Sequence, residues 1–288
     1  MNDTLATTPE PTAQSAHAPR GAVREAIERS WWDKHGTTAT VWIVRISLLV
    51  AFLVVWQLAS GRWVDDTFIS RPTDIIDRLG VWWGDGTLAS NTWVTVQEIV
   101  YGFLIGAVAG ALVGYALGAA RFVYRVLDPF IMALYSIPKV ALAPLFIVWI
   151  GIGMNMKVLL AAVTVFFLVF LNTAAAVREV DRGLVDAVRL MGGGRRQIAL
   201  KVVLPSSMAG VLTGLKVSVP YALIGAVIGE LVASNRGLGY LINDSAAQFD
   251  TAGVFAALVV LSVIAGILNL LVGLIDHRVN RWKPLAHD

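Results

Sequence analysis

The chain has 288 residues, of which 57% are hydrophobic and only 15% are charged. Since soluble domains carry about 25% charged residues, this composition excludes a soluble globular protein and predicts a polytopic membrane protein. The net charge of +3 does not argue for a nucleic-acid partner, because the basic residues lie at the edges of apolar stretches. The sequence has no cysteine, which excludes disulfides, thiolate metal sites and cysteine nucleophiles, and we expect no bound metal.

The N-terminal residues divide into two parts. Residues 1–21 are rich in Ala, Thr, Pro and Ser and lack the pattern of a signal peptide, which predicts a disordered cytosolic tail. Residues 22–36 have helical spacing, with Val23, Ile27 and Trp31 on one side and charged residues on the other. This pattern predicts an interfacial helix lying on the membrane. The alternative, that these residues form the cytosolic end of the first span, stays open.

Long apolar stretches predict six membrane spans, because about 20 apolar residues are needed to cross the hydrocarbon core. We expect the membrane domain over residues 37–278 and a cytosolic C-terminal tail over residues 279–288. The spans are expected at about residues 40–60, 94–120, 126–151, 157–177, 208–233 and 252–275. In the polar connection after the first span, residues 74–83 are expected to form a short surface helix, preceded by an extended residue before Pro72.

The second span contains glycine at a strict spacing of four residues. The glycines are Gly102, Gly106, Gly110, Gly114 and Gly118. Such a stripe leaves one side of a helix bare and lets another helix approach closely. We therefore expect these glycines to serve helix packing rather than chemistry.

The third span contains Pro138 and Pro144, and Lys139 lies between them. Proline frees backbone carbonyls and kinks a membrane helix, and a lysine beside such a kink needs a counter-charge or a wet cavity. Lys139 and Glu230 are expected either to line a passage through the membrane or to form a charge pair between the third and fifth spans. The candidate passage residues are Ser136, Pro138, Lys139, Asn172, Tyr221 and Glu230. For the uncharged polar residues among them, hydrogen bonding between helices is the alternative.

Lysine and arginine are distributed unevenly on the two sides of the predicted spans. The segments on the side of the termini hold 15 of these residues, whereas the loops on the other side hold 5. By the positive-inside rule, this difference places both termini and the polar segment 178–205 in the cytosol.

Sequence motifs for catalysis and nucleotide binding are missing. The chain contains no His-Glu-x-x-His pattern of metalloproteases and no Gly-x-x-x-x-Gly-Lys-Ser/Thr pattern that holds nucleotide phosphates. We therefore expect no enzyme and no cofactor bound by this chain, and any ATP-driven work needs another subunit. A channel is disfavoured because no repeated polar ring is found, and a secondary transporter is disfavoured because no internal repeat is found.

The polar segment 178–205 carries a pattern that resembles the cytosolic loop of binding-protein-dependent ABC transporter permeases. The family pattern is Glu-Ala-Ala, three residues, Gly, nine residues, and Ile-x-Leu-Pro. Asp186-Ala187-Val188, Gly192 and Val202-Val203-Leu204-Pro205 stand at the same spacing, with three chemically similar replacements. The resemblance extends over about residues 56–282 and is strongest to permeases of the nitrate, sulfonate and taurine group. Supporting stretches are Ser136–Leu145, Trp149–Gly153, Gly229–Leu231 and Gly237–Ile242.

The resemblance implies an all-α ABC importer permease of type I with six transmembrane helices in the bacterial inner membrane, surrounded by membrane lipid. It also implies a homodimer, two cytosolic ATPase subunits that bind ATP and Mg, and an extracytoplasmic solute-binding protein. The expected solute is a small, mostly anionic compound such as a sulfonate, taurine, nitrate, an aromatic acid or a vitamin precursor. One departure is Glu98, since many relatives carry a basic residue near the outer start of the second span. A secondary transporter driven by an ion gradient is the alternative function.

Within this resemblance, a short coupling helix in the cytosolic segment docks in a groove of an ATPase subunit. We expect Asp186 to begin this helix, because a carboxylate opposes the positive end of a helix. Ala187 and Leu190 are expected to press into the groove.

The residues after the coupling helix are expected to connect it to the fifth span. Gly192 begins a run of three glycines that permits a sharp turn. Pro205 is expected to begin the fifth span, where a missing N–H costs nothing. Arg195 and Arg196 are expected either to pair with acidic ATPase residues or to act as ordinary cytosolic anchors.

Overall fold

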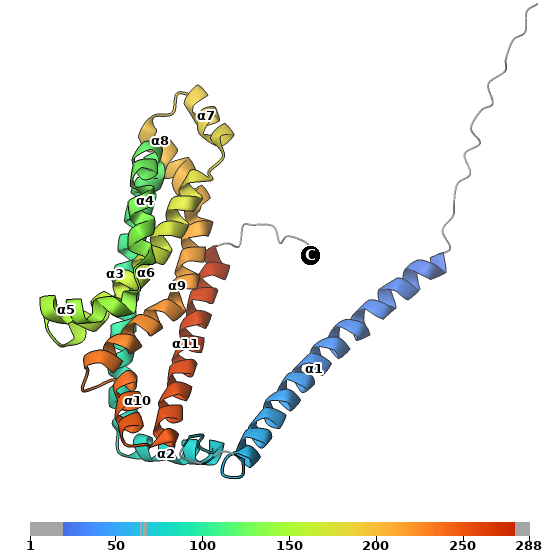
Figure 1. Ribbon diagram of the computed structural model, residues 1–288. Coiled ribbons are helices and arrows are strands. Elements are labelled where there is room, and N and C mark those ends of the chain that lie inside the picture. Colours follow the sequence, from blue (N-terminus) through green and yellow to red (C-terminus); the bar gives the residue numbers. More distant parts are fainter. Residues whose placement is uncertain (1–19, 64, 66–67, 280–288) are drawn as a thin grey trace, which may run out of the picture. The chain divides into compact units, whose positions relative to one another are not determined.

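The computed structural model describes residues 20–63, 65 and 68–279, and the elements that it assigns are helices (Figure 1). The chain divides into two units, residues 1–58 and residues 59–288. In the first unit, α1 (Arg20–Ala59) is one uninterrupted helix, and its part Thr40–Ala59 is long and apolar enough to cross a membrane. The helix has no break between residues 22–36 and the first span, and this continuity does not decide between the two interpretations of these residues. The membrane-surface location of residues 22–36 stays a prediction, and the predicted tails lie mostly outside the described residues.

The second unit contains the rest of the predicted spans. In chain order its helices are α2 (Pro72–Gly84), α3 (Thr87–Ala119), α4 (Arg121–Ser136), η1 (Lys139–Leu142), α5 (Ala143–Ile150), α6 (Met154–Arg178), α7 (Arg182–Leu190), α8 (Arg195–Ile198), η2 (Ala199–Val203), α9 (Leu204–Ala233), α10 (Leu238–Ala247) and α11 (Thr251–Val279). Helices α3, α6, α9 and α11 are each long and apolar enough to cross a membrane, and α4 with η1 and α5 forms a bent pair. With the bent pair taken as one span, the predicted all-α fold with six spans is confirmed.

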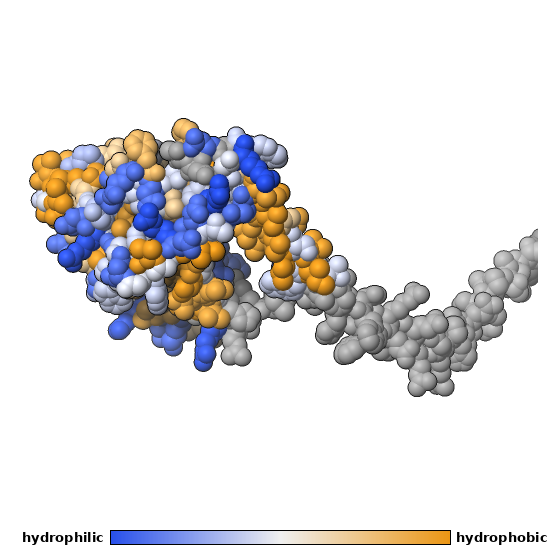
Figure 2. Space-filling view, turned by 90° about the horizontal axis from the view of Figure 1, so that it is seen from below, coloured by the Kyte–Doolittle hydropathy of each residue, from blue (hydrophilic) through white to orange (hydrophobic). Residues whose placement is uncertain are grey.

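The long helices of the second unit run side by side, and short helices cover their two ends (Figure 1). Helices α7 and α8 lie at one end, and α2 and α10 lie at the other. The view onto the second end shows hydrophilic residues gathered there, with apolar residues at its margins (Figure 2). This division is typical of a protein whose flanks face lipid and whose ends face water.

Local sequence signals explain where α2 and α3 begin. Arg71 is extended before Pro72, and the proline occupies the first turn of α2, where its missing N–H costs nothing. The connection to α3 contains Asp85, whose carboxylate accepts a hydrogen bond from the backbone N–H of Thr87 at 2.8 Å. This hydrogen bond lowers the pKa of Asp85.

The third predicted span is divided into two helices rather than kinked within one. Its two parts meet at an angle of 82°. Helix α4 ends at Ser136 because Ile137, which precedes Pro138, is extended. Pro144 lies in the first turn of α5, where it begins a helix instead of bending one.

Helix α6 lies between α3 and α9, and small residues on both sides permit its close approach. All five glycines of the predicted α3 stripe are buried and face α6. A Cβ atom built on any of them would lie 2.4–2.9 Å from an atom of α6, which is closer than van der Waals contact. On α9, a Cβ on Gly225 would lie 2.7 Å from the Cα of Ala161, and one on Gly229 would lie 2.8 Å from the Lys157 side chain. The packing of α6 therefore depends on the absence of side chains from its neighbours.

We expect Gly106→Ala to destabilise the protein strongly, because its Cβ would lie 2.4 Å from the Ala162 carbonyl oxygen. A backbone atom cannot move aside as a flexible side chain can, so the cost should reach about 1–3 kcal/mol. Thermal unfolding of the detergent-solubilised protein, followed by size-exclusion chromatography, measures this effect. Gly266→Ala is the matched control, since its Cβ would meet no atom within 4 Å. Equal melting temperatures of the two variants would contradict the conclusion that close packing requires glycine at residue 106.

Candidate functional site

The start of α7 differs from the sequence-based expectation. Asp181 is the N-cap of this helix, and its carboxylate accepts a hydrogen bond from the Gly183 N–H at 2.8 Å. The prediction that Asp186 begins the helix is wrong: Asp186 lies inside it and forms an ion pair with Arg189 at 3.0 Å. Asp181 takes the capping position because its extended backbone lets a short carboxylate reach back to the first-turn amides.

The end of α7 is a sharp turn built on glycine. Gly192 has φ +81°, a conformation that side chains disfavour. The N–H groups of Gly192 and Gly193 donate to the carbonyl oxygens of Arg189 at 2.9 Å and Val188 at 2.8 Å. These two hydrogen bonds form a Schellman motif, which satisfies the last carbonyls of the helix and reverses the chain. A Cβ on Gly193 would lie 2.5 Å from a Val188 methyl group, so this position also requires glycine.

The outward face of α7 is apolar and exposed. Leu184, Ala187 and Leu190 recur at a spacing of three residues and are all exposed. Leu190 is 90% exposed and Met191 is 85% exposed. A short polar segment that projects two such side chains beyond the helix bundle has the character of a protein-binding surface.

The connection from α7 to α9 is helical from Arg195 onwards. It contains a π-helical turn, η2, which ends at Val203, two residues before Pro205. Because proline cannot donate an N–H to the preceding turn, a wider turn at this position is the expected adjustment. The carbonyl of Ala199 in this turn accepts a hydrogen bond from the Tyr115 hydroxyl of α3 at 2.9 Å. Pro205 lies in the first turn of α9, as expected, and the π-helical turn joins α9 to α8 without a break.

A cavity of about 720 Å³ lies behind α7. Arginines line it from three elements: Arg121 of α4, Arg182 and Arg189 of α7, and Arg195 of α8. Arg195 and Arg196 are both exposed, but Arg196 does not line this cavity. The structure therefore separates the two arginines that the sequence treats alike.

The candidate passage residues do not form one cluster in a single chain. Ser136 and Asn172 donate to backbone carbonyls one turn earlier in their own helices, both at 2.8 Å. Lys139 donates to the Tyr135 carbonyl, and its ammonium group lies over the Tyr135 and Phe167 rings. Tyr221 is exposed on α9.

Pro138 and Glu230 occupy contrasting places. Pro138 lies at the exposed start of η1. Glu230 is only 1% exposed and contacts α3 and α10 instead of Lys139. The alternative of a Lys139–Glu230 charge pair is therefore wrong, because each side chain interacts with different groups.

Glu230 belongs to a buried polar network at the α10 end. Its two carboxylate oxygens accept from the Thr95 hydroxyl at 2.7 Å and from the Gly239 N–H at 2.6 Å. The Leu238 N–H donates to the Thr95 oxygen at 2.8 Å, and the Gly237 N–H donates to an oxygen of the α3 residue Asn91 at 2.7 Å. Side chains of α3 and α9 thus accept hydrogen bonds from three consecutive N–H groups at the start of α10, and these bonds hold α10 against both spans.

A buried ion pair adjoins this network. Lys157, in the first turn of α6, pairs with Glu98 of α3, and both side chains are at most 5% exposed. The same ammonium group donates to Ser234 at 3.0 Å, and the Ser234 hydroxyl donates to the Arg236 carbonyl at 2.5 Å. One lysine therefore holds together α3, α6 and the loop between α9 and α10.

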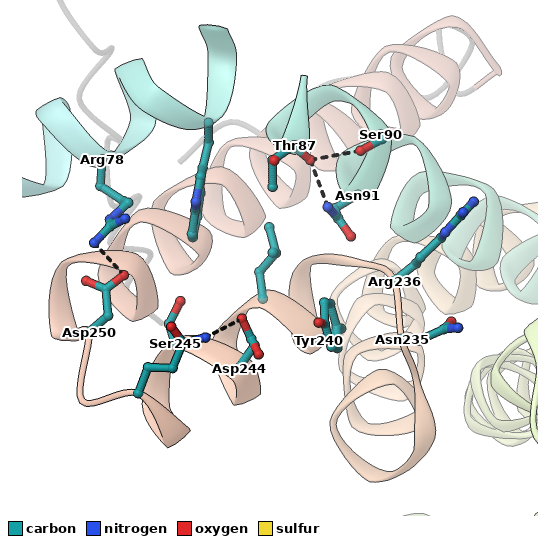
Figure 3. A pocket seen from close by; sticks show the side chains of 13 residues that line it. Arg78, Thr87, Ser90, Asn91, Asn235, Arg236, Tyr240, Asp244, Ser245 and Asp250 are labelled. Atoms are coloured by element: carbon teal, nitrogen blue, oxygen red, sulfur yellow. Dashed lines mark hydrogen bonds and ion pairs between the residues drawn. The ribbon is translucent and has the colours of Figure 1, made fainter. Parts of the chain in front are cut away.

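A polar pocket of about 480 Å³ opens beside the network, between α2, α3 and α10 (Figure 3). On one side of it, Arg78 and Asp250 form an ion pair at 2.9 Å. Asn91 and Arg236 lie on the other side, and Asp244 lies between the two sides. The pocket presents charges of both signs and can receive polar or charged groups.

Sequence reasoning missed most of the network. Asn91, Thr95 and Glu98 recur at spacings of four and three, which places them on one helix face, and this periodicity was the available signal. Lys157 gave no such signal, because a lysine at the start of a span is usually an anchor at the membrane surface. The hydrogen bond of Tyr115 to the Ala199 carbonyl also gave no signal in the sequence, since tyrosines are common in apolar helices.

With this geometry established, comparisons with known proteins identify the family. A family model described as "Binding-protein-dependent transport system inner membrane component" matches residues 102–281. The chain belongs to this family, which comprises permease components of ABC importers for small solutes rather than enzymes. Family members are multi-pass membrane proteins that work with ATPases and binding proteins, and homodimers are typical among them.

Several named relatives are similar along most of their length. SsuC of Bacillus subtilis, named for transport of aliphatic sulfonates, is 30% identical over 87% of this chain and 91% of the relative. The riboflavin transport system permease protein RibX of Chloroflexus aurantiacus is 32% identical over 90% of this chain and 94% of its own length. The taurine transport system permease protein TauC of Escherichia coli is 28% identical over 82% and 88% of the two chains.

Solved structures agree with the fold. The chain is similar to a subunit of the inward-facing MetNI methionine ABC transporter, with a TM-score of 0.58 and 23% identity over 65% of this chain and 93% of the other. It is also similar to a chain of an amino acid ABC transporter, with a TM-score of 0.58 and 16% identity over 69% and 97% of the two chains. At these identities the similarity concerns the fold alone.

We expect Lys157→Met to destabilise the protein by about 3–5 kcal/mol, because it leaves the Glu98 carboxylate buried without its partner. The double variant Lys157→Met/Glu98→Leu removes both charges and should recover most of the lost stability. Thermal unfolding of the solubilised single and double variants measures the coupling between the two residues. Independent, additive effects of the two substitutions would contradict a direct pair.

Proposed function

We propose that this chain forms the translocation pathway of an ATP-driven importer and transmits the ATP cycle of a partner through α7. The observation that carries this proposal is the exposed apolar face of α7, with Leu190 and Met191 almost fully exposed beyond the bundle. In this proposal each of two copies of the chain docks one ATPase subunit, which binds ATP and Mg. The chain itself binds no nucleotide and no metal.

A continuous helix provides the mechanical link. Residues Arg195–Ala233 run without interruption from the α7 end to Glu230, which holds the start of α10. Tyr115 joins the beginning of this helix to α3. A displacement of α7 is therefore expected to reach the opposite end of the bundle through α9, with two packings of the helices alternating during the cycle.

The uneven distribution of basic residues supports the orientation of the chain. With α7 in the cytosol, both termini are cytoplasmic and α10 lies at the extracytoplasmic end. The polar pocket beside α10 then faces the solute-binding protein. Several candidate passage residues, including Lys139 and Tyr221, lie at or near the surface of the single chain, which favours a pathway completed by a second copy.

The solute is proposed to be a small compound with an anionic group, like the sulfonates and taurine for which two relatives are named. Glu98 does not argue against an anion, because its carboxylate is buried and paired with Lys157. Arg236, in contrast, contributes a guanidinium group to the pocket at the α10 end. A vitamin or a vitamin precursor is the second class, supported by the riboflavin and formylaminopyrimidine permeases among the relatives.

Uptake by proteoliposomes tests the function. The chain is purified from its native membranes together with its associated ATPase, reconstituted, and supplied with the purified binding protein and its labelled ligand. We expect uptake that requires both ATP and binding protein and that vanadate abolishes. Uptake that continues without ATP but stops when the ion gradient is removed would show a secondary transporter instead.

We expect Leu190→Asp to reduce co-purification of the ATPase at least tenfold, because a carboxylate would have to be buried in an apolar groove. Quantitative mass spectrometry of the complex measures the ratio of ATPase to permease. Leu190→Met is the matched control and should retain the complex, since it keeps an apolar side chain of similar volume. Loss of the ATPase from both variants, or from neither, would contradict docking through this side chain.

A second variant tests the turn rather than the contact face. Gly192→Trp should assemble poorly with the ATPase or fail to stimulate it, because φ +81° at this position strains any residue with a Cβ. ATP turnover of the reconstituted complex measures this effect. Normal ATP turnover and transport by the Gly192→Trp variant would contradict a coupling role for this turn.

A further inference from the structure

A compact group of arginines lies where α4 begins and α6 ends. Arg121, Tyr124, Arg125, Asp128 and Arg178 line a pocket of about 270 Å³ there. Three positive charges face this pocket and only one carboxylate offsets them. The group is distinct from the cavity behind α7, with which it shares Arg121 alone.

Fixed contacts hold two of the arginines in place. The Arg121 guanidinium donates to the Arg178 carbonyl at 3.1 Å. The Arg178 guanidinium stacks on the Tyr124 ring, with its central carbon 3.8 Å from the ring centre, and its Nε donates to the Ala174 carbonyl at 3.3 Å. These contacts use backbone and aromatic acceptors, which orient the guanidinium groups without neutralising them.

Arg125 completes the group with a charge that forms no ion pair among the described residues. It follows Arg121 by one helical turn, so the two like charges lie on the same side of α4. Within the part of the chain that the structure describes, its side chain has neither an ion-pair nor a hydrogen-bond partner. The α4 N-terminus adds partial positive charge, because Ala120 before it supplies no side-chain cap. An anion in this pocket would relieve repulsion among all these groups.

The position along the spans indicates which anion is available. Arg121 begins α4 and Arg178 ends α6, so the pocket lies where two apolar helices reach the polar boundary of the membrane. On α4, Phe122, Val126 and Phe130 recur at a spacing of four and are exposed, the two phenylalanines by 77% and 66%. This apolar stripe runs from the pocket towards the centre of the membrane. A ligand with a phosphate head and an acyl chain matches both parts.

We propose that this pocket binds the phosphate group of an anionic phospholipid, with an acyl chain lying along the Phe122–Val126–Phe130 stripe. Guanidinium groups suit this ligand because their planar N–H pairs match phosphate oxygens in bidentate geometry. A free phosphate would gain the same polar contacts but would leave the stripe uncovered. The site lies beside the α6–α7 connection, so a bound lipid would fix the cytosolic ends of α4 and α6 next to the docking segment.

Native mass spectrometry of the full-length, delipidated permease in detergent tests the proposal. The protein is titrated with phosphatidylglycerol and, separately, with phosphatidylcholine of the same acyl chains. We expect wild-type protein to bind phosphatidylglycerol more tightly than phosphatidylcholine. Arg125→Gln should weaken phosphatidylglycerol binding roughly tenfold, the loss expected for one charge-assisted contact to phosphate. Arg125 is exposed, so its replacement should leave the fold intact.

Two controls separate a built site from general attraction between a basic membrane edge and anionic lipid. Arg278→Gln removes an exposed arginine at the end of α11 and should leave the affinity unchanged. Arg125→Lys keeps the charge but not the bidentate geometry and should recover binding only partly. Equal losses in Arg125→Gln and Arg278→Gln, or equal binding of the two lipids, would overturn the site. If millimolar inorganic phosphate displaced phosphatidylglycerol, the pocket would be a site for a soluble anion, and the proposal of a lipid site would be wrong.

Discussion

The close approach of α6 to α3 and α9 is the constraint on which the rest of the second unit depends. Membrane helices gain little from burying apolar surface against each other, so their association relies on contact between surfaces without intervening side chains. Glycine on α3 and small residues on α9 supply such surfaces on two sides of α6. The position of α6 in turn sets the position of Lys157 at one end and Arg178 at the other. The buried network that contains Lys157 and the arginine group that contains Arg178 therefore both depend on the position of α6.

The two ends of the bundle use this scaffold differently. At the α10 end, the polar groups are buried and paired, and they hold the start of α10 against α3 and α9. At the α7 end, the polar segment projects away from the bundle, ends in a glycine turn and exposes its apolar face. A buried polar network resists movement, whereas an exposed apolar helix face has the character of a binding surface. The continuous helix from Arg195 to Ala233 connects the two ends, and in the proposed function it transmits docking at one end to the packing at the other.

Sequence patterns were reliable where a single local rule decided the outcome. The length of the apolar stretches placed the spans, and the strict repeat of glycine from Gly102 to Gly118 identified a packing face before its partner was known. The spacing from Asp186 to Pro205 identified the family, which the match over residues 102–281 supports independently. The patterns were unreliable for helix ends: Asp181, and not Asp186, caps α7, because capping depends on backbone angles that composition does not reveal.

The sequence by itself determined the class of protein, the number of spans and the glycine face of α3, since each follows from hydrophobic length or from a fixed period along one helix. Only the tertiary structure decided which charges neutralise each other. Glu98 and Lys157 are separated by most of two spans in the sequence but share one buried site, whereas Lys139 and Glu230, equally plausible partners in the sequence, do not. Pairing inside a membrane depends on which helix faces meet, and that choice is made by close packing between helices rather than by any property of one helix.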